Sequence, residues 1–535
     1  MKKKFEVWLP LLFSLVMIIG MFIGYKLRGA QPNGGFAKTG RSTALEEALE
    51  IIRQKYVDSV KIDTLETNAI REMMNELDPH SIYLPPIDLK EANEELSGKF
   101  EGIGVEYNQI RDTVNITYVL KDGPSEKAGL RIGDQIIRVN DSLLAGKKTT
   151  SATVRNLIRG EKGTTVNLQI LRNKALLTVR VVRNNIPTPT LVASYMIDPK
   201  AGYIKLDKFG SNTYREFMEA MEQLKKQGLT ELVLDLRGNG GGYMDQAIQV
   251  ADEFLSGDKL VVFTQGTNSP KKEYRCKRPG IFETGKLTVL VDELSASASE
   301  ILTGALQDWD RATIIGRRTF GKGLVQEIFP LSDGAALKLT VSRYYTPLGR
   351  SIQRPYNKGK KVYMDDIWER YANGQAYFAD SNKVNNGKQY KTPSGRILYG
   401  GGGIMPDIFV GLDTSKTSKE INRLFFNGAI TDFVFHYYLE HQKVMDPYAS
   451  PRSFSQDFDP EKTMWPLFVT RAQKDTVNLT HIPEAEKLRV SNRMEAYLAR
   501  FKWRDSGYYQ ILNLTDSVVL KAVDHLKTNE DGDQK

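Results

Sequence analysis

The spacing of apolar residues changes several times along the 535-residue chain, and each change predicts a different kind of structure. An almost uninterrupted apolar run covers residues 7–25, and about 20 such residues are enough to cross a bilayer as a helix. Gly-rich and polar residues over 29–41 predict a flexible tether. Apolar positions at helical spacing over 43–55 and 70–77 then predict an N-terminal helical region, 42–97.

From about residue 100 the pattern changes to short β-rich runs separated by turns. Strands are expected at 114–119, 135–139, 165–171 and 176–182, the last two forming a hairpin. Two short helices are expected between them, at 125–128 and 151–158. A small β-rich domain is the simplest interpretation of this stretch.

After Pro187 and Pro189 strands and helices alternate, which predicts a largely parallel and buried sheet. The expected strands are 202–206, 232–236, 287–291, 312–315 and 336–344, and the expected helices are 213–226, 243–255 and 298–307. Thr213 and Glu216 have the spacing of a capping box at the start of the first of these helices. Beyond residue 411 the chain becomes aromatic and helical, so a mainly helical extension is expected over 411–535.

Charge and composition exclude several classes of protein. The formal net charge of +9 is spread along the chain and interleaved with acidic residues, which does not indicate a nucleic-acid partner. A single cysteine, Cys276, rules out an intramolecular disulfide and a thiolate metal site. The five histidines lack the spacing of a zinc-binding helix, so neither a metal nor a cofactor is expected.

Charges around the apolar run predict its topology. Lys2, Lys3 and Lys4 precede it, and such a positive flank stays in the cytoplasm. Residues 1–28 are therefore expected to form an uncleaved single-pass anchor in a bacterial inner membrane, with the catalytic part in the periplasm. A cleaved signal peptide is the alternative, although the residues around Ala30 make a poor cleavage site.

Two segments have features of a reaction centre. Residues 234–242 join an apolar strand to a helix through a glycine-rich turn, whose backbone N–H groups can approach a ligand closely. The turn lacks the Gly-Lys-Ser/Thr of a phosphate loop and the glycine spacing of a dinucleotide fingerprint, so it favours binding of an oxyanion. Residues 291–300 join another strand to a helix through serine and alanine. Those serines either cap the helix or include an exposed nucleophile, as at the strand–helix junctions of hydrolases.

A lysine completes the candidate chemistry. Lys322 stands between two glycines and beside Phe320, an unusual setting for a surface charge. Burial would lower its pKa and allow it to act as a base. Gln326 lies four positions further on, on the same face of a strand or a helix, where its amide oxygen can orient the ammonium group.

Together these segments resemble the C-terminal processing peptidases, also called tail-specific proteases. The resemblance runs from about residue 42 to 410 and rests on Leu77–Ser81, Asp235–Asn239, Ser295–Glu300, Phe320–Gly323, Gln326, Tyr344–Pro347, Gly349–Gln353, Gly401–Ile404 and Pro406–Asp407. In that family the nucleophile precedes the lysine by 25 positions. Since 322 − 297 = 25, this selects Ser297 over Ser295 and Ser299.

The resemblance also implies a fold and a set of site residues. It implies a crotonase/ClpP-like α/β peptidase core over 186–410, with an inserted PDZ domain over 98–185. In the core, Ser297, Lys322 and Gln326 are the implied catalytic residues, and the N–H groups of Gly238 and Ala298 would bind the oxyanion. One departure is Gly240, where the family usually has proline, which loosens the turn without removing its donors.

In the PDZ domain, the loop of Gly102, Ile103, Gly104 and Val105 would hold the C-terminal carboxylate of a substrate. Arg159 occupies the segment in which the family has an arginine that couples this domain to the active site.

The expected function is that of a serine endopeptidase that cleaves extracytoplasmic proteins near their C-termini. Its expected partners are peptide and protein substrates, and a homo-oligomer or an activating protein is left open. The main alternative is a PDZ scaffold on an inactive peptidase fold, and a carrier of small apolar ligands has no support beyond fold analogy.

Overall fold

The computed structural model describes residues 13–22, 43–110, 112–146, 149–379, 388–413, 418–474, 477–479 and 481–528. The chain comprises two compact units, Met1–Met73 and Met74–Lys535. In the first unit, α2 (Ala44–Lys55) begins at Thr43, whose side chain and that of Glu46 form a reciprocal capping box. The expected helix over 43–55 is therefore confirmed, and α3 (Ile62–Asn75) extends the second expected helix toward its N-terminus.

The predicted single-pass membrane anchor, and the inner-membrane and periplasmic location that followed from it, are wrong. Within the described ranges, no helix has both the length and the apolar character needed to cross a membrane. Of residues 7–25, only 13–22 are described, as a helix, and the others lie outside the described residues. The expectation of extracytoplasmic substrates rested on the same segment.

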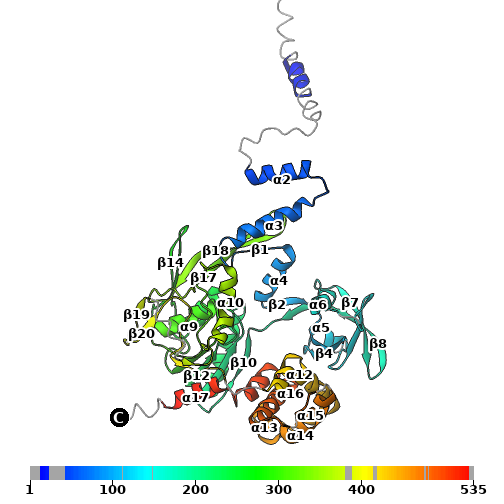
Figure 1. The fold of residues 1–535 in the computed structure, drawn as a ribbon, viewed down its shortest axis with the longest axis vertical. Coiled ribbons are helices and arrows are strands. Elements are labelled where there is room, and N and C mark those ends of the chain that lie inside the picture. The colour runs from blue at the N-terminus through cyan, green and yellow to red at the C-terminus, as the bar shows by residue number, and fades with distance from the viewer. Residues whose placement is uncertain are drawn as a thin grey trace, which may run out of the picture. The chain divides into compact units, whose positions relative to one another are not determined.

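A six-stranded sheet forms the centre of the second unit (Figure 1). Its strands, in spatial order, are β10 (Leu191–Met196), β11 (Ala201–Leu206), β12 (Glu231–Asp235), β15 (Lys286–Val291), β16 (Thr313–Gly316) and β21 (Ile408–Phe409). β10 runs antiparallel to β11, and every other neighbouring pair is parallel. The predicted largely parallel and buried sheet is confirmed.

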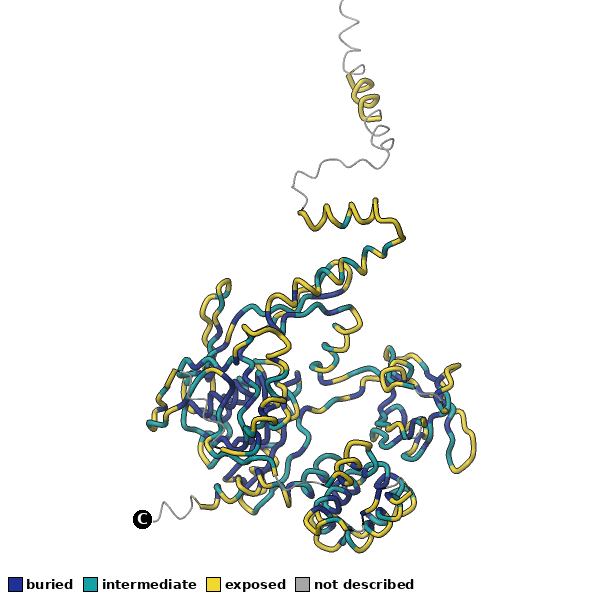
Figure 2. Tube along the Cα trace, in the orientation of Figure 1, coloured by how far each residue is buried: buried dark blue, intermediate teal, exposed yellow. Residues whose placement is uncertain are grey.

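Helices cover both faces of this sheet, and its inner strands β11, β12, β15 and β16 are largely buried (Figure 2). Successive side chains of a strand point to opposite faces. Leu232 and Leu234 pack in the cluster that includes α7 (Thr213–Lys226), α8 (Met244–Asp252) and α9 (Ala298–Asp308). Val233 packs instead against α17 (Ser517–Thr528), the last described helix. The C-terminal extension therefore contributes to the core of the sheet.

The predicted capping box of α7 is wrong. Asn212 is the N-cap residue, and its side chain makes no capping hydrogen bond. The Thr213 hydroxyl instead accepts the N–H of Gly210 and donates to Thr190. The Glu216 carboxylate accepts the N–H and hydroxyl of Thr190, 2.7 and 2.9 Å away. Both side chains tie the helix start to Thr190, immediately before β10, which the spacing alone could not distinguish from a cap.

A second, antiparallel sheet of five strands was predicted only in part. It contains β1 (Ile82–Leu84), β13 (Leu260–Gly266), β14 (Ser269–Arg275), β17 (Leu324–Pro330) and β18 (Ala336–Tyr345). Only β18 was expected, because β14 is largely exposed and polar and β17, although mostly apolar, lacks a period-2 apolar pattern. β17 begins one residue after Gly323, so the sheet fixes the end of the segment that carries Lys322.

The β-rich region folds around its own core. Its sheet contains β3 (Val105–Ile110), β4 (Thr113–Val119), β5 (Gln135–Val139), β6 (Ser142–Leu143), β7 (Thr165–Arg172) and β8 (Ala175–Val182), with α5 (Pro124–Lys127) and α6 (Ser151–Ile158). The predicted hairpin of β7 and β8 is confirmed. β3 is an edge strand that pairs only with β4. The chain enters and leaves this region through the paired strands β2 (Lys99–Gly102) and β9 (Asn184–Pro187).

Most of the remaining described elements are helices. They are α10 (Lys360–Ala372), α11 (Lys419–Phe426), α12 (Ala429–Glu440), α13 (Pro451–Asp457), α14 (Pro460–Thr463), α15 (Trp465–Lys474) and α16 (Glu484–Leu512), with a short hairpin of β19 (Gln389–Lys391) and β20 (Ile397–Tyr399) after α10 and a 3-10 turn, η2 (Gln442–Met445), after α12. From α11 to α16 they enclose a separate apolar core. The expected mainly helical character beyond residue 411 is confirmed for the described residues.

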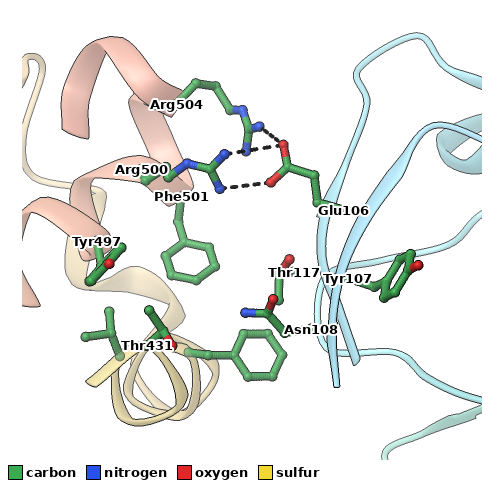
Figure 3. A pocket seen from close by; sticks show the side chains of 11 residues that line it. Glu106, Tyr107, Asn108, Thr117, Thr431, Tyr497, Arg500, Phe501 and Arg504 are labelled. Atoms are coloured by element: carbon green, nitrogen blue, oxygen red, sulfur yellow. Dashed lines mark hydrogen bonds and ion pairs between the residues drawn. The ribbon is translucent and has the colours of Figure 1, made fainter. Parts of the chain in front are cut away.

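This helical region contacts the edge strand β3 across a cavity of about 250 Å³ (Figure 3). Glu106 of β3 accepts hydrogen bonds from Arg500 at 2.8 Å and from Arg504. Arg504 has non-helical φ and ψ and interrupts α16, and its guanidinium lies 3.3 Å from the centre of the Tyr118 ring. The contact fixes the outer face of the strand that borders the predicted peptide site.

Candidate functional site

Three serines lie around the N-terminus of α9, two before its first residue and one within its first turn. Only one of them has an accessible side chain. Ser295 and Ser299 are fully buried. Their hydroxyls donate to the carbonyls of Leu236 at 2.8 Å and Asn239 at 2.9 Å. Ser297 is partly exposed and is the N-cap residue of α9. The structure therefore favours Ser297 over its two neighbours as a group that can meet a substrate.

Ser297 has an unusual backbone conformation. Its φ of 55° and ψ of −114° lie outside the regions that residues with a side chain prefer. Strain of this kind collects at functional sites, and a strained turn between strand and helix exposes the nucleophile of many hydrolases. Gly241 makes the turn possible, because a Cβ there would lie 2.7 Å from the Ala296 carbonyl oxygen and 2.8 Å from the Ser297 Cβ. The glycine-rich turn thus packs directly against the serine segment.

Lys322 has the electrostatics expected of a base. Burial, and to a lesser extent the positive charge of Lys338, lower its pKa to about 8, against the opposing charges of Glu300 and Asp78. A lysine near pKa 8 is partly neutral at neutral pH, unlike a free lysine near 10.4. The prediction that burial would depress this pKa is supported by the surroundings of the side chain.

Two buried side chains hold the serine and lysine segments together. The Glu300 carboxylate accepts the N–H groups of Ser297 and Lys322, each at 2.9 Å and both at Oε2. The Tyr344 hydroxyl lies 3.0 Å from the Ser297 carbonyl oxygen and 2.5 Å from that of Lys322. The backbones of both candidate catalytic residues are therefore fixed by the same two groups. Among the described contacts there is no hydrogen bond between the Ser297 hydroxyl and the Lys322 ammonium.

Glu300 accepts two further hydrogen bonds, from the Thr319 hydroxyl at 2.5 Å and the Gly321 N–H at 2.7 Å. Burial raises the pKa of its carboxyl to about 7, although its four donors favour the ionised form. A fully buried carboxylate with four donors is the central anchor of the site. Sequence reasoning gave Glu300 no role. Its signals were its place at the end of the Ser295–Glu300 run and its position three residues after Ser297, typical of a capping box.

Gln326 does not contact Lys322 in the described structure. Its amide nitrogen donates to the Thr340 hydroxyl at 3.2 Å. The Thr340 N–H in turn donates to the hydroxyl of Ser81, which donates to Asp78. These linked hydrogen bonds bring the Asp78–Ser81 segment beside Lys322. His80 lies there too, bonded to the Tyr363 hydroxyl at 2.8 Å, and burial lowers its pKa to about 3.

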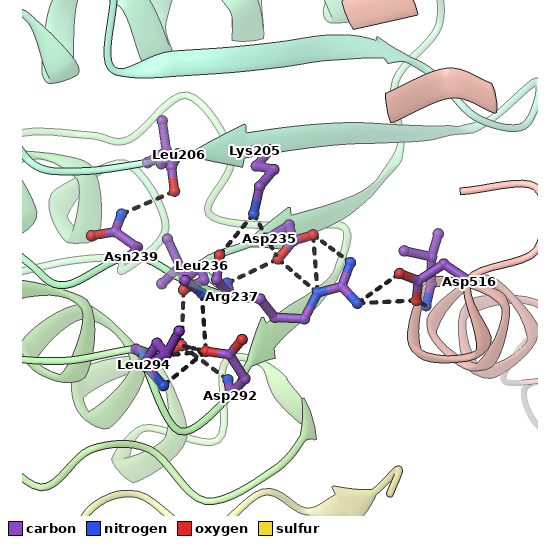
Figure 4. A network of polar contacts seen from close by, with 12 residues as sticks. Lys205, Leu206, Asp235, Leu236, Arg237, Asn239, Asp292, Leu294 and Asp516 are labelled. Atoms are coloured by element: carbon purple, nitrogen blue, oxygen red, sulfur yellow. Dashed lines mark hydrogen bonds and ion pairs between the residues drawn. The ribbon is translucent and has the colours of Figure 1, made fainter. Parts of the chain in front are cut away.

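The two predicted oxyanion donors differ in availability. Ala298 is the first residue of α9, where an N–H has no partner within the helix. The Gly238 N–H, in contrast, donates to Asp292 Oδ1 at 2.9 Å (Figure 4). The same oxygen accepts the N–H groups of Leu294 and Ser295, at 3.0 and 3.2 Å. In this conformation a carboxylate occupies one of the two predicted donors.

The predicted carboxylate-binding loop lies between β2 and β3. Gly102, Ile103 and Gly104 are buried, and Val105 is partly buried and begins β3. Within the described part of the chain, the N–H groups of Ile103 and Gly104 donate no hydrogen bond, whereas the Ile103 carbonyl accepts two and the Gly104 carbonyl accepts one. The Tyr107 hydroxyl of β3 donates to the Ser151 carbonyl of α6 at 3.1 Å.

Arg159 lies at the C-terminus of α6 and contacts the helix that leads toward the site. It donates to Glu94 of α4 (Pro86–Leu96) at 3.0 Å, and its guanidinium lies 4.4 Å from the centre of the Phe100 ring. α4 follows β1, which follows the Asp78–Ser81 segment. The structure therefore brings Arg159 to an element continuous with the surroundings of Lys322.

Two family models match the chain. Residues 200–359 match peptidase family S41, and residues 102–182 match the PDZ domain. The carboxy-terminal processing protease CtpB of Bacillus subtilis is 35% identical over 321 residues, which cover 58% of this chain and 65% of that protein. The carboxy-terminal-processing protease of Bartonella bacilliformis is 35% identical over 314 residues, which cover 57% of this chain and 71% of that protein.

Among solved structures, the photosystem II D1 C-terminal processing protease is 28% identical, with a TM-score of 0.35. That similarity covers 70% of this chain and 89% of the other. The match to CtpB spans slightly less than two thirds of that relative's length.

Proposed function

The chain belongs to peptidase family S41, the carboxy-terminal processing serine proteases, and from this premise we propose that it cleaves proteins near their C-termini with Ser297 as nucleophile and Lys322 as general base. The predicted fold class, an α/β peptidase core with a PDZ domain, is confirmed by the two family models. Within the proposal we keep the sequence-derived domain limits, 98–185 for the PDZ domain and 186–410 for the peptidase core.

One observation carries the proposal: an accessible, strained serine and a lysine of lowered pKa are held by the same two buried groups. Glu300 and Tyr344 bond both backbones. Neither the N-cap role of Ser297 nor a surface charge at Lys322 requires that arrangement. A nucleophile and its general base do require such an arrangement, because the distance between their reacting atoms must be kept within a few tenths of an ångström.

The reaction proceeds in two halves. The Ser297 Oγ attacks the scissile carbonyl carbon while the neutral Lys322 amine takes the hydroxyl proton. The resulting ammonium then protonates the leaving amine as the C–N bond breaks, which leaves an acyl ester on Ser297. In the second half Lys322 takes a proton from water, the hydroxide attacks the ester, and Ser297 recovers its proton. Gln326 orients the lysine when its amide leaves Thr340.

The oxyanion formed in each half needs N–H donors. Ala298 supplies one. Gly238 supplies the second only after Asp292 releases it, because an N–H that binds a carboxylate is not free for a second anion. Burial raises the pKa of Asp292, which weakens its hold as an anion. We therefore assign the described conformation to the enzyme before substrate arrives.

The pH dependence of the rate should follow the ionisation of Lys322. Its pKa of about 8 leaves roughly a tenth of it neutral at pH 7 and nine tenths at pH 9, so kcat/KM should rise about tenfold between them. The measurement is kcat/KM on a labelled unfolded protein from pH 6 to 10. Lys338→Gln removes a positive neighbour, which raises the pKa of Lys322 and moves the profile to higher pH. A flat profile, or an optimum on the acid side, would contradict the role of Lys322.

The PDZ domain should capture the C-terminal carboxylate of a substrate through the N–H groups of the Gly102–Val105 loop. Each such bond contributes about 1.5–3 kcal/mol. A peptide with a free C-terminus should therefore bind at least about tenfold more tightly than its amide, since 1.4 kcal/mol is a factor of ten. Competition for cleavage of one labelled substrate measures both affinities.

Two glycine variants separate the loop from general strain in the domain. Gly104→Val should abolish the preference, because φ is 75° there and a Cβ would lie 3.1 Å from Ile186 Cδ1. Gly163→Val, also at positive φ but in open space, should keep it. Equal affinity of the wild type for acid and amide would exclude capture of the C-terminus. We propose that Arg159, through Glu94, couples an occupied PDZ domain to the peptidase core. Equal affinity for acid and amide would remove this role.

A further inference from the structure

A buried charge network holds Arg237, the residue immediately before Gly238 in the glycine-rich turn (Figure 4). Asp235 ends β12 and is fully buried. Arg237 donates its N–H to Asp235 at 2.9 Å and its Nη2 at 2.6 Å. The Tyr203 hydroxyl donates to the same carboxylate at 2.7 Å, and the Lys205 ammonium donates to the Arg237 carbonyl at 2.8 Å. Side chain and backbone of Arg237 are thus fixed immediately before Gly238.

The network would carry an unbalanced charge without the C-terminal region. Lys205 and Arg237 contribute two positive charges, and Asp235 contributes one negative charge. Buried charges are tolerated when they are paired. Asp516 supplies the missing negative charge, because Arg237 Nη1 donates to its two carboxylate oxygens at 3.0 and 2.9 Å.

Asp516 is itself held in place by α17. Its Oδ1 accepts the N–H groups of Val518 and Val519 at 2.9 and 3.1 Å, as a helix cap does. Val519 and Ala522 of the same helix are fully buried against the peptidase sheet. The carboxylate is therefore positioned by a helix that is anchored on the same sheet as the turn.

We propose that Asp516 is a positioning residue of the peptidase site: from outside the region matched by the family model, it holds Arg237 and thereby the glycine-rich turn that faces Ser297. The inference rests on the proposed function. It extends the active site to the C-terminal helical region, which the family motifs do not cover. Among the described hydrogen bonds, the Asp516 side chain contacts Arg237 and the start of α17 and not the Gly102–Val105 loop, so Asp516 acts on the chemical step and not on capture of the substrate.

Asp516→Asn tests this role. Asparagine caps a helix about as well as aspartate but carries no charge, so the variant removes the ion pair and keeps the cap. A shift of a catalytic group by about 1 Å can lower the rate about 100-fold, and we expect kcat to fall at least about tenfold. KM should stay within about twofold. Asp516→Glu restores the charge and should recover most of kcat.

Asp432→Asn is the matched control. Asp432 lies in α12 of the same helical region and pairs with Arg471 at 2.9 Å, with an exposed fraction equal to that of Asp516, 20% of the side chain. It lies outside the network that holds the turn. The control should lower the unfolding temperature by a similar amount and leave kcat unchanged.

The experiment uses the full chain, labelled casein as an unfolded substrate and thermal unfolding followed by circular dichroism, with kcat given per folded molecule. The inference predicts that kcat falls in Asp516→Asn, returns to most of the wild-type value in Asp516→Glu and stays unchanged in Asp432→Asn. An active wild type with equal kcat in both asparagine variants would overturn the inference and leave the proposed function standing. A wild type that does not cleave casein or any peptide with a free C-terminus would overturn both.

Discussion

Ser297→Ala is expected to lower the rate of cleavage of an unfolded protein by at least about 10⁴-fold, the scale seen when a serine peptidase loses its nucleophile. The substitution removes the only accessible hydroxyl of the three in this segment. The fold should survive, because the lost N-cap side chain is worth only about 1 kcal/mol. Initial rates on labelled casein and the thermal unfolding temperature measure the two effects.

The neighbouring serines give the controls for this prediction. Ser295→Ala and Ser299→Ala each remove one of the two donors to a buried carbonyl, which costs about 0.5–1.5 kcal/mol of stability. Both variants should retain cleavage per folded molecule. An active Ser297→Ala beside an inactive Ser295→Ala would show that the nucleophile had been misassigned.

The lysine should behave as the partner of that serine. Lys322→Ala should lose activity to a similar extent. Lys322→Arg should be inactive as well, because a guanidinium stays protonated throughout the accessible pH range and cannot accept a proton. Activity in the arginine variant would mean that the positive charge, and not the base, matters.

Glu300→Gln is expected to have the second large effect, on stability as well as on catalysis. The carboxylate accepts four donors, and an amide offers one oxygen and presents its own N–H groups to the others. Losing two charge-assisted bonds at about 1.5–3 kcal/mol each destabilises the fold by roughly 3–6 kcal/mol. The backbones of Ser297 and Lys322 are then no longer held by one oxygen, so kcat per folded molecule should fall about 100-fold.

Glu293→Gln is the matched control for Glu300. It is also buried and lies in the same segment, but its carboxylate pairs with Arg317 at 2.8 Å. It should lose stability and keep kcat per folded molecule. Denaturant unfolding and initial rates at several temperatures separate the two quantities. If both glutamine variants lost kcat equally, Glu300 would be a general packing residue rather than the link between serine and lysine.

The sequence predicted the parts of the site that local pattern encodes. The alternation of apolar strands and helices predicted the parallel sheet, and the strand–helix junction placed Ser297 at the start of α9. Lys322 between two glycines predicted a buried base, which its pKa of about 8 supports. Each of these features involves residues close together in the chain.

What the sequence did not predict depends on contacts between distant residues. Tyr344 reaches both catalytic backbones from β18, and Asp516 reaches Arg237 from a helix 279 positions away. The Gly238 N–H was expected to be free, and the structure pairs it with Asp292. No periodicity or motif specifies which buried donor meets which acceptor.

Apolar character alone also misled at the N-terminus. Residues 7–25 have the length and composition of a membrane span, whereas within the described residues no helix is long and apolar enough to cross a membrane. The anchor was inferred from the length and hydropathy of that run alone.

The most direct test of the account is to map the covalent intermediate. The wild type, Ser297→Ala and Lys322→Ala are each incubated with a serine-reactive fluorophosphonate, digested and analysed by mass spectrometry. The account predicts one adduct in the wild type, on the Ser297 hydroxyl, and none in either variant, because the serine is unreactive without its base. An adduct on Ser295 or Ser299, or casein cleavage that persists in Ser297→Ala, would contradict it.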